Sequence, residues 1–169
     1  VMTTELRVQL LGAGTILREV EAAASILEND YQVAADVWSL TSVNELQREG
    51  KAALRWNLHH PQDEPRVPYV TQQLQEETGP FIAATDYMKS YTDQIREFVP
   101  GRFTVLGTDG FGRSDTREKL REFFEVSREY IVVAALKSLA DEGALEQSRV
   151  AEAMRTLGIA PDKIDPLTV

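Results

Sequence analysis

Short apolar runs alternate along this chain with longer segments in which apolar residues recur every three or four positions. The runs predict strands over residues 6–11, 33–40, 81–84 and 102–106. Between the first two runs, one helical stripe is formed by Ile16, Val20, Ala23, Ala24 and Leu27. Two strands joined through a helix imply parallel neighbours with a right-handed crossover. The pattern therefore predicts an α/β fold, a three-layer sandwich with a mostly parallel sheet of about five strands.

The segment between the second and third strands is expected to hold a helix followed by a loop. Ser42 with Glu45 fits a capping box, and the helix is expected to break at Gly50 and to resume until Pro61. Prolines and acids dominate residues 61–68, which favours an exposed connection. The next stretch, 67–74, is compatible with an edge strand or with a helix.

The second half of the chain has the pattern of several further helices. They are predicted over residues 87–98, 116–124, 130–141 and 150–157. The expected caps are Asp86 for the first helix, a capping box of Asp115 and Glu118 for the second, and Ser127 for the third. The order of elements thus remains that of an α/β fold.

The size, charge and cysteine content of the chain limit which classes of function it can have. We expect residues 1–169 to form a single domain, with 161–169 as a loosely held C-terminal tail. The net charge of −9 argues against nucleic-acid or anionic-membrane partners, because phosphate groups are bound by clustered Lys and Arg. No run approaches the roughly 20 apolar residues of a membrane span. The lack of cysteine excludes disulfides and thiolate chemistry and fits a cytoplasmic location.

The turn Gly12-Ala13-Gly14 lies between a predicted strand and a predicted helix, where backbone amides attract phosphate groups. The dinucleotide fingerprint is incomplete, however. Leu17 stands at the third glycine position, and Asp36 lies near the start of the second strand instead of its carboxyl end. We therefore interpret the glycines as a tight turn.

Other residues that could take part in catalysis or ligand binding also have a structural interpretation. His59 and His60 are adjacent, so their side chains point in different directions, and we expect them at a helix end instead of in a metal site or a catalytic triad. Asp86 and Asp109 are a candidate carboxylate pair near the carboxyl ends of neighbouring strands. Arg113 is a candidate for binding a carboxylate or phosphate, although a structural pair is the commoner role.

A loop of glycines and small polar residues, 107–115, follows the fourth predicted strand. Together with other segments of the chain, this loop closely resembles the C-terminal domain of the bacterial homodimeric pyruvate dehydrogenase E1 family, a branch of the transketolases. The resembling segments are residues 9–12, 15–20, 35–39, 55–58, 65–72, 84–89, 105–115 and 130–137. The resemblance therefore extends over nearly the whole chain.

This resemblance implies a transketolase C-terminal-like fold and a fragment of a longer E1 chain. The parent enzyme would decarboxylate pyruvate oxidatively with thiamine diphosphate and magnesium and transfer the acetyl group to the lipoyl group of the E2 dihydrolipoyl acetyltransferase. The implied partners are the other domains of the E1 chain, the second E1 protomer and E2. Glycolysis would supply the pyruvate, and acetyl-CoA would be the product of the complex.

The family's thiamine motif, Gly-Asp-Gly followed by paired asparagines, is absent from this sequence, because residues 107–110 differ and Asn29, Asn44 and Asn57 are isolated. The resemblance therefore implies that other domains bind the cofactor and the metal, and that this domain is structural and inactive by itself. A loop at an interface or at the substrate entrance is the expected role of its glycine-rich segment, with Asp109, Phe111, Arg113 and Asp115.

Two alternatives stand beside this interpretation. One is a freestanding module that binds an anion or a nucleotide with loops 12–15 and 107–115. The other is a pure protein-interaction domain, which exposed clusters of Trp, Tyr or Phe would support. Micromolar binding of a nucleotide or sugar phosphate by the isolated chain would favour the first alternative.

Overall fold

The computed structural model describes residues 5–169, and within them a parallel sheet contains four strands in the order β2-β1-β3-β4. The strands are β1 (Arg7–Ala13), β2 (Ala34–Leu40), β3 (Phe81–Thr85) and β4 (Phe103–Leu106). All four coincide with predicted strands. The sheet is one strand smaller than expected, because the ambiguous segment 67–74 folds as helix α3 (Tyr69–Leu74) behind Pro68.

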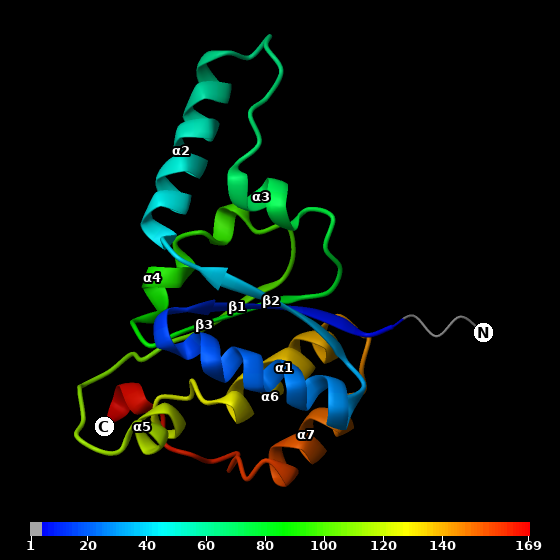
Figure 1. Ribbon diagram of the computed structural model, residues 1–169, viewed down its shortest axis with the longest axis vertical. Coiled ribbons are helices and arrows are strands. Elements are labelled where there is room, and N and C mark those ends of the chain that lie inside the picture. Colours follow the sequence, from blue (N-terminus) through cyan, green and yellow to red (C-terminus); the bar gives the residue numbers. More distant parts are fainter. Residues whose placement is uncertain (1–4) are drawn as a thin grey trace.

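Helices cover both faces of the sheet, so the predicted three-layer α/β sandwich is confirmed (Figure 1). One face carries η1 (Gly14–Ile16), α1 (Leu17–Tyr31), α6 (Arg128–Asp141) and α7 (Gln147–Thr156). The other carries α2 (Val43–His59), α3 and η2 (Arg96–Phe98). The remaining helices are α4 (Lys89–Asp93), α5 (Arg117–Phe123) and η3 (Pro166–Thr168).

Each face of the sheet has its own apolar core. Val8 and Leu10 of β1 pack with α1, α6 and α7, whereas Leu11 joins the core formed with α2, α3 and η2. Strand β3 is buried at all five positions, as is typical of a central parallel strand covered on both sides. Strand β2 forms an edge of the sheet, and its side chains are only partly covered.

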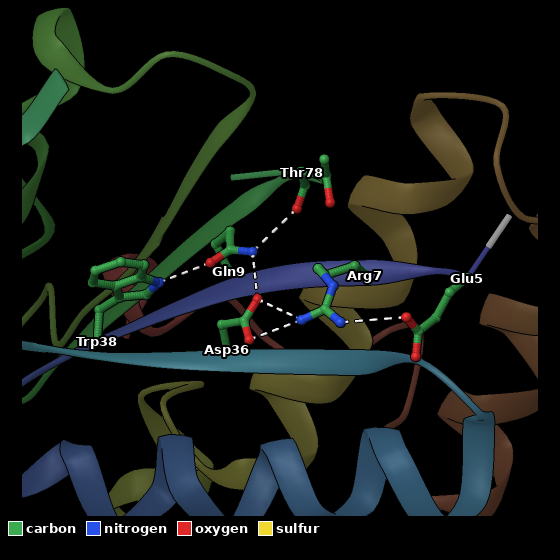
Figure 2. Close-up of polar contacts among 6 residues, drawn as sticks. All are labelled: Glu5, Arg7, Gln9, Asp36, Trp38 and Thr78. Carbon is green, nitrogen blue, oxygen red and sulfur yellow. Dashed lines mark hydrogen bonds and ion pairs between the residues drawn. The ribbon is translucent and has the colours of Figure 1, made fainter. Parts of the chain in front are cut away.

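A chain of polar contacts joins β1 to the edge strand β2 (Figure 2). Gln9, which is fully buried, donates from Nε2 to Asp36 Oδ2 at 2.8 Å and accepts from Trp38 Nε1 at 2.8 Å. Arg7 Nη1 donates to both oxygens of Asp36 at 2.8 Å. Gln9 and Asp36 are also register partners. Because a slip by one residue would separate all these groups, the contacts specify the register of β2.

Helix α2 is continuous through Gly50, so the predicted break there is wrong. A Cβ at this position would lie 2.5 Å from the ring of Phe98, which is itself buried. The glycine is therefore explained by a close helix contact, not by a helix end. Pro61 does follow the end of the helix, as the sequence predicts.

Several predicted caps and one predicted helix differ from the structure. Residues 87–98 form only the short α4 and η2, and Asp86 caps neither. The N-cap of α5 is Thr116, whose Oγ1 accepts from Lys119 N at 3.4 Å, while Asp115 accepts from Thr116 N at 2.7 Å. Ser42 and Ser127 stand at N-cap positions without a capping hydrogen bond from the side chain. Tertiary contacts thus override several of the local signals.

The C-terminal tail, 161–169, is mostly exposed and contacts the rest of the domain around Pro166. Pro166 is buried, and Asp165 Oδ1 accepts from Leu167 N at 2.9 Å at the start of η3. A Cβ on Gly110 would lie 2.7 Å from the carbonyl oxygen of Pro166. The tail therefore lies directly against the glycine-rich loop, near the C-terminus marked in Figure 1.

Two glycines with similar positive φ allow a test of backbone crowding. Gly79 has φ +87°, and a Cβ there would lie 1.9 Å from the carbonyl oxygen of Arg7, whereas Gly143 has φ +75° and open space around it. We expect Gly79→Ala to lower the free energy of unfolding by more than about 2 kcal/mol and Gly143→Ala by about 1 kcal/mol. Urea unfolding measures both values. Equal losses would contradict the crowding at Gly79.

Candidate functional site

From β1 the chain continues to β2 on one side of the sheet and then to β3 on the other side, so the strand order switches between β1 and β3. An open α/β sheet normally binds its ligand at the carboxyl ends of the strands at such a switch point. Three parts of the chain meet there. They are the turn after β1 at Gly14, the residues after β3 at Asp86, and the glycine loop, which we define as residues 107–115.

Internal hydrogen bonds close this position. Thr15 Oγ1 donates to Asp86 Oδ2 at 2.8 Å, and Thr108 Oγ1 donates to the carbonyl oxygen of Asp86 at 3.0 Å. A Cβ on Gly14, which has φ +65°, would lie 3.1 Å from Asp86 Oδ1. The Asp86 carboxylate thus lies beside the first residues of η1, where a phosphate group would have to bind. The geometry therefore disfavours an anion at this turn, because the anion would meet a carboxylate.

The remaining parts of the incomplete dinucleotide fingerprint also have structural roles. A Cβ on Gly12 would lie 2.8 Å from Leu17 Cα, so this glycine permits close packing of β1 against α1. The Asp36 carboxylate is bound by Arg7 and Gln9. Burial raises the pKa of Asp36, but the hydrogen bonds from Arg7 and Gln9 outweigh it and hold the pKa below its usual value.

Asp86 and Asp109 share this edge of the sheet but have separate partners. Asp109 Oδ1 accepts from the backbone N–H of Lys89 at 3.0 Å, at the start of α4. A Cβ on the neighbouring Gly107 would lie 2.7 Å from the same nitrogen. The hydrogen bonds therefore hold the glycine loop against the segment after β3, and each carboxylate is paired with a different structural partner.

The other predicted site residues divide into anchored and exposed ones. The Arg113 guanidinium lies 4.2 Å from the centre of the Phe123 ring, which attaches the loop to α5. Asp115 is bound to the Thr116 backbone. Phe111 has no such anchor in the described part of the chain and is 80% exposed. Arg113 and Asp115 are exposed as well, but of the four predicted residues Phe111 is the one that presents a large apolar side chain to a partner.

Exposed apolar side chains surround the glycine loop. We define the edge patch as Tyr87, Met88, Phe111 and Leu167, which are 45–80% exposed. Asp109 bonds to the residue after Met88, and Gly110 lies against the backbone of Leu167, so the contacts of the loop bring these segments together. Exposed apolar clusters of this kind are typical of protein–protein contacts.

A buried ion cluster that we did not predict holds α5, the helix that the glycine loop contacts through Arg113 and Phe123. Glu19 is 5% exposed, and its Oε1 accepts from Arg121 Nη1 at 2.8 Å while its Oε2 accepts from Arg128 Nε at 3.0 Å and Arg128 N at 3.1 Å. These contacts join the first turn of α1 to α5 and to the start of α6. A sequence signal did exist, because Glu19 lies within the apolar stripe of its helix, three residues after Ile16.

Opposing effects act on the Glu19 carboxyl. Burial raises its pKa, but the hydrogen bonds and charges of Arg128 and Arg121 outweigh burial and hold the pKa below its usual value. The cluster borders a cavity of about 670 Å³ that is lined by both acids and arginines, including Arg117, Glu118 and Glu122. Because the arginines of this lining face several carboxylates, the cavity disfavours binding of a free anion.

The histidines occupy a helix end, as the sequence predicts. Helix α2 ends at His59, and the His60 ring stacks on Trp56 with centroids 4.2 Å apart. Within residues 5–169, no cluster of three or more His, Cys, Asp or Glu is placed to hold a metal ion. None of the helices described in these residues has the length and apolarity needed to cross a membrane.

Comparison with known proteins gives a consistent set of similarities. A family model described as the transketolase-like TK C-terminal domain matches residues 2–127. The chain is 58% identical over 161 residues to the pyruvate dehydrogenase E1 component of Pseudomonas aeruginosa and 51% identical to that of Escherichia coli K12, in each case covering 95% of this chain. It spans only 18% of the length of these relatives.

A solved structure is similar in fold. A split-gene transketolase, described as an inactive beta4 tetramer, matches with a TM-score of 0.55 and 17% identity. The match covers 81% of this chain and 40% of the transketolase chain. At this identity the similarity concerns the fold alone, and it agrees with the parallel sheet and its two helical layers.

Glu19 provides a test of the ion cluster. We expect Glu19→Gln to lower the free energy of unfolding at pH 7 by about 1–3 kcal/mol, because Arg128 and Arg121 lose their shared charge partner. Since the pKa of Glu19 is lowered in the folded state, its stabilisation is present above the ordinary value of 4.5 and is lost as the pH falls through the folded-state pKa.

Urea unfolding of both proteins at neutral and acidic pH measures this difference. The matched control is Glu21→Gln, on the exposed side of the same helix, which should change the free energy of unfolding by less than about 0.5 kcal/mol. A gap between Glu19→Gln and the unsubstituted chain that stays constant down to low pH would contradict the ion cluster.

Proposed function

Because this chain belongs to the family of transketolase-like C-terminal domains, we propose that residues 1–169 are the C-terminal domain of a pyruvate dehydrogenase E1 component. The parent enzyme would carry out oxidative decarboxylation of pyruvate with thiamine diphosphate in the cytoplasm and would transfer the acetyl group to the lipoyl group of E2. The observation that carries this proposal is the identity of 43–58% to E1 components along 95% of the chain or more.

Within that enzyme, we assign this domain a structural role. Its residues do not fit thiamine diphosphate and magnesium, since the turn after β1 presents the Asp86 carboxylate where a diphosphate would approach. The described residues also lack a cluster of metal ligands. The cofactor would therefore be held by other domains of the E1 chain, and this domain would have no turnover of its own.

The surface around the glycine loop supports a role in contacts with the rest of E1. Asp109 and Arg113 hold the loop against neighbouring segments, Asp115 accepts from Thr116 N at the start of α5, and Phe111 is exposed. A rigid loop with an exposed aromatic side chain is suited to binding a partner, because little conformational entropy is lost on association. We therefore assign the edge patch to an interface with another E1 domain or with the second E1 protomer.

The enzyme assignment is tested by assaying the full-length polypeptide beside the isolated chain, with pyruvate, thiamine diphosphate, magnesium and an electron acceptor. We expect turnover from the full-length polypeptide and none from residues 1–169 alone. Turnover by the isolated chain would overturn its structural role. Micromolar binding of inorganic phosphate by the isolated chain would instead favour the anion-binding module.

The interface assignment is tested at Phe111. In the full-length polypeptide, Phe111→Ala should lower the thermal midpoint by about 2–4 °C, because a buried aromatic contact would be lost. In the isolated chain, where this side chain is 80% exposed, the midpoint should change by less than about 1 °C. Ile164→Ala, at a side chain that is 64% exposed outside the edge patch, is the matched control and should have no effect in either protein. Equal midpoints for Phe111→Ala and the unsubstituted full-length protein would contradict the interface.

A further inference from the structure

The outer half of α2 and the loop after it extend away from the sheet as a projection at the top of Figure 1. We define the arm as residues 51–69. Four of its apolar side chains are unusually exposed: Leu54 at 39%, Leu58 at 78%, Val67 at 40% and Tyr69 at 51%. Leu54 and Leu58 are four residues apart and so lie on the same face of the helix. The arm thus presents apolar surface away from both cores of the domain.

Side-chain contacts within the arm fix its shape. The Trp56 ring stacks on His60, with ring centroids 4.2 Å apart, and the Arg66 guanidinium lies 4.2 Å from the centre of the same ring. Asn57 Nδ2 donates to the Arg66 carbonyl oxygen at 2.9 Å, and Arg66 N donates to Asn57 Oδ1 at 2.7 Å. His60 Nδ1 donates to the Trp56 carbonyl oxygen at 2.8 Å. The loop is therefore folded back on the helix.

None of these contacts belongs to either of the two apolar cores, which contain no residue between 51 and 69. A flexible connection between α2 and α3 would need no such bracing. The contacts keep the exposed leucines on a preformed surface, and this lowers the entropic cost of binding a partner. The arm therefore presents a preformed apolar surface to solvent.

The helical part of the arm differs in charge from the whole chain. Residues 51–60 contain Lys51, Arg55 and two histidines but no acid, in a chain of net charge −9, and the acids of the arm, Asp63 and Glu64, lie in the loop that follows. Within the described residues, neither Lys51 nor Arg55 forms an ion pair. These cations lie beside the exposed leucines in sequence. A fitting partner surface is therefore apolar at its centre and acidic at its rim.

We propose that the arm docks onto the remainder of the E1 polypeptide, with Leu54 and Leu58 buried in the contact and Lys51 and Arg55 facing carboxylates. This inference rests on the proposed function. In the relatives, more than four-fifths of the polypeptide lies outside the region that matches this chain. The remainder of such a polypeptide is large enough to offer a surface for the arm. A second copy of this domain is a poorer occupant, because a symmetric contact centred on Leu54 and Leu58 would bring Lys51 and Arg55 of both copies into one interface.

Hydrogen exchange measured by mass spectrometry tests the docking. We expect the amides of residues 51–59 to exchange at least about tenfold more slowly in the full-length polypeptide than in the isolated chain, because docking opposes opening of the helix. Leu58→Gln and, separately, Arg55→Glu should restore fast exchange in the full-length protein. The matched control, Ile164→Gln, replaces a similarly exposed aliphatic side chain and should leave the protection of the arm unchanged.

A fold defect is distinguished from a docking defect in the isolated chain. Leu58 is 78% exposed there, so Leu58→Gln should shift the thermal midpoint of the isolated chain by less than about 2 °C. Equal exchange of residues 51–59 in the isolated and full-length proteins would overturn the proposal. Protection that appears in the isolated chain and is lost on dilution would also overturn it, in favour of a second copy.

The pyruvate assay separates this inference from the proposed function. An active full-length protein with an unprotected arm would refute the docking and leave the enzyme assignment intact. A protected arm in a full-length protein without pyruvate turnover would support docking onto the remainder of the polypeptide and refute the enzyme assignment.

Discussion

The buried carboxylate of Glu19 is the contact on which the arrangement around the glycine loop depends. It lies in the first turn of α1 and binds Arg121 of α5 and both the side chain and the backbone of Arg128 at the start of α6. Apolar packing alone would leave the position of α5 poorly specified, because none of its residues is buried. A charge removed from water requires its partners at fixed positions, so Glu19 gives α5 a defined place relative to the sheet.

The arrangement at the carboxyl edge of the sheet depends on the position of α5. The glycine loop is held at one end by Asp109 and Thr108, which contact the segment after β3, and at the other by Arg113, which contacts Phe123 of α5. Internal groups thus fill the position where α/β sheets commonly bind ligands. Two exposed apolar surfaces remain available to partners. They are the edge patch around Phe111 and the arm, which extends from α2. Both suit a domain that works through contacts with other parts of a larger enzyme.

Local patterns were sufficient for most of the fold. Four apolar runs marked the four strands, and the run is clearest for β3, which is buried on both faces and therefore needs continuous apolar side chains. The stripe from Ile16 to Leu27 marked α1 for a similar reason. Prediction failed where a local signal had a distant partner. Gly50 is a contact point for Phe98 within α2, and Asp86 binds Thr15, 71 residues away in sequence, so it is not available to cap a helix.

The candidate site was likewise predictable where it depends on neighbouring residues and unpredictable where it depends on distant ones. By itself, the sequence determined that residues 107–115 form a glycine-rich loop after a strand and that the chain resembles one domain of a longer enzyme, because both are properties of neighbouring residues. Only the tertiary structure decided that Asp109 and Arg113 contact other segments while Phe111 is exposed. It also decided that Glu19 joins residues more than one hundred positions away. Pairing over such distances depends on how the helices pack, and no local pattern records it.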